Sequence, residues 1–448
     1  MLRTLLAWII ILGVAVGYVA LSSVRHPDDI VQPGTERVSL PAEMNGKLMR
    51  SLGQFATDFG QPGIMSDAQL ASAAPPPESP WIDRLAFAIL KADLLGADAG
   101  LAELDNARLE QDAPDSDVAL RDAVERHLTS WRDGGARTAL EPDQAKRLGW
   151  YATVIDGSAP PSRAIVGVML IGLFMGCVAL AGVVLHITGL ILLMIGSLRS
   201  ALVVTQASAV RGSVYAETFA VWFVLFVGAQ LGAGILVQAL GLADRTEVAL
   251  GAAFVAFFAS LAALVWPVMR GLSWSTVCED IGLTAGKGVI REILVGPLVY
   301  AAGLPIMIAG LIIYLLLRTL FPETEQASHP IVETFGGGGL GIVAVFAVAC
   351  IAAPIVEEIA FRGVLYRHLR ESERFLGRIV AVVLSTVISS VIFAGIHPQG
   401  LLFIPVLGGL ATAFCLGREW RGSLISAIVA HAINNAVTLS LGVTIAGG

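Results

Sequence analysis

Long apolar runs dominate this chain from residue 164 onward, and one more stands near its beginning. A helix needs about 20 apolar residues to cross the hydrocarbon core of a bilayer. The run at 164–198 is too long for one upright span and short for two, so it is read as one long tilted helix. The pattern predicts an all-α, polytopic transmembrane helix bundle of about eight or nine spans. The predicted spans are residues 5–21, 164–198, 214–242, 248–269, 293–317, 340–365, 379–396, 401–416 and 424–445.

A polar segment at residues 25–163 interrupts this pattern. Within it, apolar residues recur every three or four positions over 81–104 and 116–131, with charges between them. This period predicts two amphipathic helices. We therefore expect an inserted small helical extramembrane domain at about 80–155, which either docks a partner or substrate or is only a solvated appendage.

Composition and charge separate these two parts of the chain. Hydrophobic residues make up 55% of the 448 residues and charged residues 15%, whereas soluble proteins average about 25% charged. An ordinary soluble globular protein is therefore excluded. The chain carries a net charge of −7, and residues 25–163 alone contribute −8, from 22 acidic and 14 basic residues. No basic stripe with interleaved aromatic residues occurs, which argues against a nucleic-acid partner.

Lysine and arginine gather in the connections after the second, fourth, sixth and eighth spans. The positive-inside rule makes these connections cytoplasmic. With Arg3 held inside, residues 1–24 form an N-terminal membrane anchor that sends the acidic segment out of the cytoplasm; a signal peptide is the alternative. We expect an integral, multi-pass protein of the bacterial inner membrane.

Three places in the apolar part hold polar side chains that are costly in a membrane unless they are paired or face a cavity. Taken singly, each has a structural explanation: a buried ion pair, a helix-end cap, or a polar contact between helices. Their joint occurrence in the last third of the chain favours one functional site. The residues are Glu357, Glu358 and Arg362, then His397, then His431 and Asn435.

Helical geometry gives these pairs a direction. Glu358 and Arg362 are four residues apart and can pair on one face, while Glu357 points about 100° away. His431 and Asn435 are also four apart. At about 1.5 Å per residue, Glu357 and His431 each lie roughly 15 Å from the same cytoplasmic boundary.

His397 fits this depth less well, because it lies roughly 28 Å along its own helix. If it comes down to the level of the others, one carboxylate can take a proton from water, a histidine can relay that proton, and a second histidine with an amide can donate to an oxyanion. No serine stands out beside a histidine as an activated nucleophile, so water is the economical attacking group. The same residues also suit a proton or ion path in a transporter or channel.

The three motifs resemble those of the CPBP family of intramembrane endopeptidases, which includes CaaX prenyl proteases and bacteriocin-processing proteins. That family carries EExxxR, FxxxH, and HxxxN or HxxxD on successive membrane helices. Here the motifs occupy Glu357–Arg362, Phe393–His397 and His431–Asn435, once each and in this order. The resemblance covers roughly residues 290–446 and does not extend to 25–163.

This resemblance implies three roles: activation of water, orientation of the site, and stabilisation of the oxyanion. In that order they fall to Glu357 with His397, to Glu358 with Arg362, and to His431 with Asn435. The cofactor stays open. Glu357, His397 and His431 can supply three ligands if a divalent metal such as zinc is present, and a metal-free mechanism uses the same residues.

The sequence thus predicts the anchor and acidic segment, transmembrane helices of unassigned role at 164–290, and a CPBP-like catalytic bundle at 291–448. The expected function is hydrolysis of a peptide bond in a membrane-associated peptide or protein, by water that a glutamate activates. The alternatives are a proton- or ion-coupled transporter or channel, and an inactive protease-like scaffold. The sequence specifies neither the substrate nor the oligomeric state.

Overall fold

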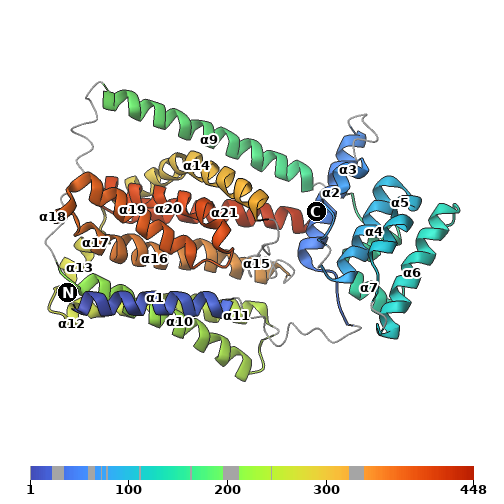
Figure 1. The fold of residues 1–448 in the computed structure, drawn as a ribbon, viewed down its shortest axis with the longest axis horizontal. Helices are drawn as coiled ribbons and strands as arrows, with labels where there is room; N and C mark the ends of the chain where they lie inside the picture. The colour runs from blue at the N-terminus through green and yellow to red at the C-terminus, as the bar shows by residue number, and fades with distance from the viewer. Residues whose placement is uncertain are drawn as a thin grey trace. The chain divides into compact units, whose positions relative to one another are not determined.

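Every regular element that the structure describes is a helix, and no strand occurs among those residues (Figure 1). This confirms the predicted all-α class. Residues 23–34, 162 and 163, where two predicted segment boundaries fall, lie outside the described part of the chain. The computed structural model describes residues 2–22, 35–58, 66–71, 73–76, 79–109, 112–161, 164–194, 211–243, 245–321 and 338–447.

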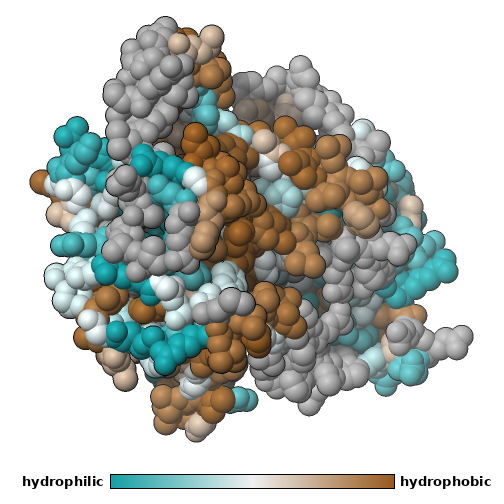
Figure 2. Space-filling model, turned by 60° about the vertical axis from the view of Figure 1, so that its left-hand side comes forward, coloured by the Kyte–Doolittle hydropathy of each residue, from teal (hydrophilic) through white to brown (hydrophobic). Residues whose placement is uncertain are grey.

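Nine stretches of the described residues are long and apolar enough to cross a membrane, as the sequence predicts. Many of their large apolar side chains face outward, and Figure 2 shows hydrophobic areas of this kind on the visible face. The chain is an integral, multi-pass membrane protein. The stretches are Leu2–Val19, Ala164–Leu192, Val214–Ala239, Thr246–Met269, Val289–Leu320, Gly339–Arg370, Arg378–Gly395, Leu401–Arg421 and Ile425–Ala446.

One compact unit contains the first helix and residues Leu173–Leu439, and we call it the membrane unit. Within it α14 lies against α20, α20 against α19, and α1 along α10 (Figure 1). Its helices are α1 (Leu2–Ser22), most of α9 (Ala164–Met194), α10 (Val214–Ala239), α11 (Thr246–Ser260), η3 (Leu261–Leu264), α12 (Val265–Met269), α13 (Trp274–Ile281), α14 (Val289–Leu320), α15 (Gly338–Ala347), η5 (Val348–Ala352), α16 (Ala353–Glu358), η6 (Ile359–Leu365), α17 (Tyr366–Arg370), α18 (Glu373–Leu376), α19 (Arg378–Gly395), η7 (Leu401–Phe403), α20 (Ile404–Arg421) and most of α21 (Ile425–Gly447).

The end of the membrane unit formed by α12, α13, α17 and α18 is rich in arginine, and we call it the arginine-rich end. The sequence predicts these arginines only as a charge bias. In the structure several of them are paired with carboxylates, which offsets the unfavourable burial of both charges. The pairs include Arg421–Glu292, Arg370–Glu419, Arg367–Glu371 and Arg211–Asp280.

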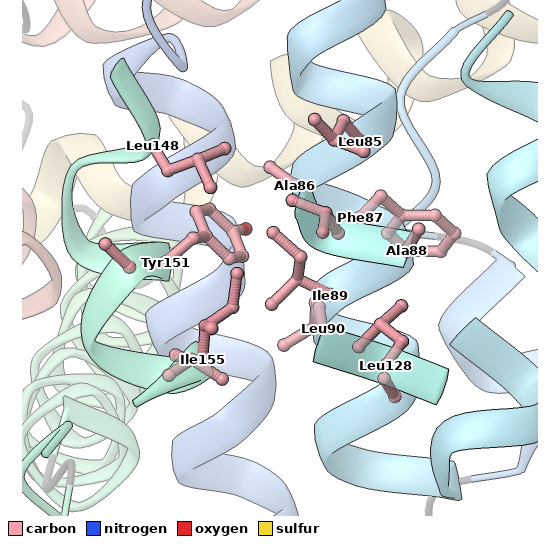
Figure 3. Packing of buried hydrophobic residues seen from close by; sticks show 14 of the residues in the cluster. Leu85, Ala86, Phe87, Ala88, Ile89, Leu90, Leu128, Leu148, Tyr151 and Ile155 are labelled. Atoms are coloured by element: carbon pink, nitrogen blue, oxygen red, sulfur yellow. The ribbon is translucent and has the colours of Figure 1, made fainter. Parts of the chain in front are cut away.

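The second compact unit covers most of the acidic segment, and we call it the acidic unit. Leu85, Ile89, Leu128, Tyr151 and Ile155 converge in its hydrophobic core (Figure 3). Because these residues come from three helices, α4, α6 and α8, the unit has a core of its own. Its complete helices are α2 (Leu40–Asp58), α3 (Asp67–Ala71), α4 (Trp81–Leu95), α5 (Ala97–Glu103), η2 (Leu104–Asn106), α6 (Asp115–Arg132), α7 (Pro142–Leu148) and α8 (Trp150–Ile155).

The acidic unit differs from the sequence prediction in two respects. The helix expected over 81–104 is broken at Gly96, whose φ of 100° only glycine adopts readily. In addition, Met49 and Leu52 of α2 pack against the core, so the unit reaches beyond the expected limits of 80–155. The spacing of apolar residues over 81–104 continues past Gly96, so it does not reveal that this one residue has a positive φ.

Candidate active site

The helix that carries the two adjacent glutamates is framed by irregular turns. The six-residue α16 lies between η5 and η6, both of which are π-helical. Pro354 has no N–H to donate to the carbonyl of Cys350, which is a local reason for the first wide turn. π-turns occur frequently at functional sites, and here they set the directions in which Glu357 and Glu358 leave the helix.

Glu358 is fully buried and has two charged or polar neighbours on the same oxygen. Arg362 donates from Nη1 to Glu358 Oε1 at 2.9 Å, which is the (i, i+4) pair that the sequence predicts. His431 Nδ1 lies 2.9 Å from that oxygen. A carboxylate oxygen paired with arginine only accepts hydrogen bonds, so His431 carries its proton on Nδ1. Glu358 therefore fixes the tautomer of His431.

Aromatic rings enclose this polar cluster. The guanidinium carbon of Arg362 lies 4.4 Å from the ring centroid of Phe393 and 5.2 Å from that of Phe414. The His431 ring stacks on Phe414 at 5.2 Å and meets Phe393 edge-on at 5.9 Å. Such cation–π and ring contacts hold a buried cation without further carboxylates.

Glu357 lies on the other side of His431. Its Oε2 is 3.9 Å from His431 Nε2, and its side chain keeps 15% of its surface exposed. Because Nδ1 carries the proton, Nε2 of the neutral ring has a lone pair that faces the carboxylate. The contact between the Glu357 carboxylate and His431 Nε2 is favourable when one of the two carries a proton, or when a water donates a hydrogen bond to each. His431 thus lies between two carboxylates that have different environments.

The other two predicted site residues are placed differently from the expectation. The ring of His397 lies 4.5 Å from that of Phe393, and its Nδ1 lies 2.6 Å from the Phe393 carbonyl oxygen. Both contacts are with a residue one turn earlier in the same helix, and the contact with Glu357 described above is made by His431. Asn435 donates from Nδ2 to the carbonyl of Ala349 at 2.7 Å, so it fastens α21 to the first π-turn.

Sequence reasoning missed one residue near the site. Tyr18 of α1 lies within electrostatic range of Glu357, and its ring packs 6.5 Å from that of Phe223. A tyrosine inside the first apolar run is the only signal in the sequence, and it does not reveal that α1 packs along α10.

The residues suggested as zinc ligands do not form a metal-binding group. Over the described ranges, no three histidine, cysteine, aspartate or glutamate side chains come together as a metal site requires. Glu357 and His431 are neighbours, but His397, the third suggested ligand, does not form a group of three with them. The arrangement does not fit a three-ligand zinc centre, and no step below depends on a metal.

Comparison with known proteins identifies the segment that carries the three motifs. Residues 339–437 match the family model described as Type II CAAX prenyl endopeptidase Rce1-like, which agrees with the family that the motifs resemble. A curated relative is the membrane-embedded CAAX protease MroQ of Staphylococcus aureus (strain USA300). It is 36% identical over 85 residues, which are 19% of this chain and 34% of that protein. The match thus spans about a third of the relative's length. No solved structure matches the chain significantly.

Proposed function

We propose that this protein is an intramembrane endopeptidase that hydrolyses a peptide bond of a membrane-associated peptide or protein. The observation that carries the proposal is the position of His431 between two carboxylates, 2.9 Å from Glu358 and 3.9 Å from Glu357, in the segment that matches the endopeptidase family. A buried, hydrogen-bonded imidazole beside a partly exposed carboxylate is suited to move a proton.

In this mechanism Glu357 is the general base. It takes a proton from a water that attacks the substrate carbonyl, and His431 Nε2 shares that proton and returns it to the leaving amine. Glu358 holds His431 in the tautomer that leaves Nε2 able to accept, and Arg362 donates a hydrogen bond to Glu358. General-base catalysis of this kind typically contributes about 10²–10⁴-fold in rate.

The oxyanion needs donors on the opposite side of the carbonyl. An amide nitrogen has two N–H groups, and Asn435 uses one of them for Ala349. We assign the second to the oxyanion. His397 lines the same cage, and its Nε2 is oriented by the contact of Nδ1 with the Phe393 carbonyl.

The test is cleavage of membrane-associated peptides by the purified full chain in nanodiscs, with products identified by mass spectrometry. Wild type should cleave, and Glu357→Gln should not. The matched control is Glu247→Gln, which changes another glutamate of a spanning helix, in the first turn of α11. Equal cleavage by wild type and Glu357→Gln, or ion flux in liposomes that depends on Glu357, would instead favour the transporter alternative.

A further inference from the structure

A stripe of buried hydroxyl groups runs along α19 toward the site. Ser385, Thr386, Ser389 and Ser390 each expose at most 4% of their surface. Because residues four apart share a helix face, Ser385 lies one turn before Ser389 on the same face of α19, and Thr386 lies one turn before Ser390. Thr412 of α20 completes the stripe from the other side, with its Oγ1 3.5 Å from Ser390 Oγ.

Two hydroxyls of this stripe, Ser385 Oγ and Thr386 Oγ1, have no hydrogen-bond partner among the described residues, and neither has Glu358 Oε2 at the site. Thr218 of α10 shows the usual solution for a hydroxyl in an apolar helix, since it donates to the carbonyl of Val214 at 2.8 Å. A buried polar atom that lacks any partner is unfavourable. In native proteins such atoms bind ordered water, which typically makes about three hydrogen bonds.

Polar groups of the neighbouring helices border the stripe where it approaches the site. Ser389 donates to the carbonyl of Phe361 at 3.5 Å, and the Cys415 thiol lies beside both Ser389 and Arg362. Arg362 is the partner of Glu358. The hydroxyl stripe therefore comes close to Arg362, the partner of the active-site carboxylate of Glu358.

Toward the arginine-rich end the polar groups continue. The η6–α17 helix runs antiparallel to α19, and Ser389 lies beside Phe361. One turn back along α19, at Ser385, therefore corresponds to about one turn forward along η6–α17, near Tyr366. Tyr366 donates to Glu419 at 2.9 Å, and Arg370 donates to the same carboxylate at 3.1 Å. Glu419 lies one helical turn after Cys415. Polar atoms thus occur at every turn between this end and the site.

We propose that bound water occupies the hydroxyl stripe of α19 and connects the active-site carboxylates with the aqueous phase at the arginine-rich end. The role of this water as the reagent in hydrolysis rests on the proposed function, whereas its binding does not. Water suits this stripe because the Ser385 and Thr386 hydroxyls have no protein partner, lie one turn from the Ser389 and Ser390 hydroxyls, and a buried water needs at least two polar neighbours.

The test is X-ray radiolytic footprinting of the purified full chain in lipid nanodiscs. Radiolysis turns water into hydroxyl radicals, so a buried side chain is oxidised quickly only where water is bound beside it. Phe393 and Phe414 pack on Arg362, where the stripe approaches the site. Phe219 and Phe223 lie in an aromatic cluster of α10, and all four phenylalanines are at most 2% exposed. We expect several-fold faster oxidation of the first pair, and equal rates in both pairs would overturn the proposal.

A matched pair of variants locates the water. Thr386→Val removes a hydroxyl that has no protein partner, and Thr218→Val removes one that its own helix satisfies. The first should slow the oxidation of Phe393 several-fold, and the second should leave it unchanged. Equal effects of the two variants would contradict binding at the stripe. The labelling needs no substrate, so Glu357→Gln should keep the fast oxidation of Phe393 while it loses cleavage. If wild type cleaves but Phe393 is oxidised as slowly as Phe219, the proposal of bound water is overturned and the proposed function is not.

Discussion

At the scale of single residues, the site depends on the unequal surroundings of two adjacent glutamates. Glu358 is fully buried, with Arg362 and His431 on one oxygen, whereas Glu357 keeps 15% of its side chain exposed. The buried glutamate can therefore orient the histidine while its neighbour meets substrate. An adjacent pair is needed because residues one apart on a helix point in different directions.

The ion pair of Glu358 and Arg362 gives the first prediction. Arg362→Met leaves a buried carboxylate without its cation, which typically destabilises a protein by about 3–5 kcal/mol. Thermal unfolding in detergent measures this loss. The double variant Glu358→Gln, Arg362→Met removes both charges and should recover part of the stability. A double variant less stable than Arg362→Met alone would contradict the buried pair.

At the scale of helices, apolar period and spacing predict the spans and the Glu358–Arg362 pair, but they do not predict the irregular turns. The π-turns around α16 and the break at Gly96 arise from one or two residues within an otherwise regular pattern. The contact of His431 with Glu358, 73 residues apart, depends on how the helices pack. For the same reason the sequence does not predict the contact of Asn435 with Ala349.

The break between α4 and α5 gives a second prediction. Gly96 has a φ of 100°, and a Cβ there would meet no atom within 4 Å, so the strain is in the backbone alone. Gly96→Ala should destabilise the acidic unit by about 1–2 kcal/mol, seen as a lower melting temperature. Gly251→Ala, in the regular helix α11 with equal space around it, is the control. An unchanged melting temperature for Gly96→Ala would contradict the break.

Asp83, near the start of α4, gives a third prediction. Burial raises its pKa above the usual aspartate value, although Ser39 donates to both carboxylate oxygens. A folded state with the higher pKa binds the proton more tightly than the unfolded chain, so stability is lost as pH rises through that pKa. Asp83→Asn should remove this part of the pH dependence of unfolding. A pH profile identical to that of wild type would show that Asp83 does not titrate in this way.

At the scale of the whole molecule, the described residues form a membrane unit rich in helices long and apolar enough to cross a membrane, and an acidic unit that has its own core. By the positive-inside rule, the arginine-rich end of the membrane unit should face the cytoplasm, which sets the orientation of the protein in the membrane. The proposed active site and its water supply would then be open to that side. The acidic unit would be outside the cytoplasm.

This orientation is the fourth prediction. Cys278 lies in α13 at the arginine-rich end, and burial raises the pKa of its thiol, so its labelling by maleimide should be slow at neutral pH. In spheroplasts an impermeant maleimide should reach Cys278 only after permeabilisation. In the variant Ser158→Cys, which places a cysteine at an exposed position of the acidic unit, the new cysteine should be labelled before permeabilisation. The reverse order of labelling would contradict the predicted orientation.

The most direct measurement of the central claim is the single-turnover rate of peptide cleavage by Glu357→Gln compared with wild type. If Glu357 is the general base, the rate should fall by about 10²–10⁴-fold, while the melting temperature stays within that of the Glu247→Gln control. Cleavage at the wild-type rate in a folded Glu357→Gln protein would contradict the account.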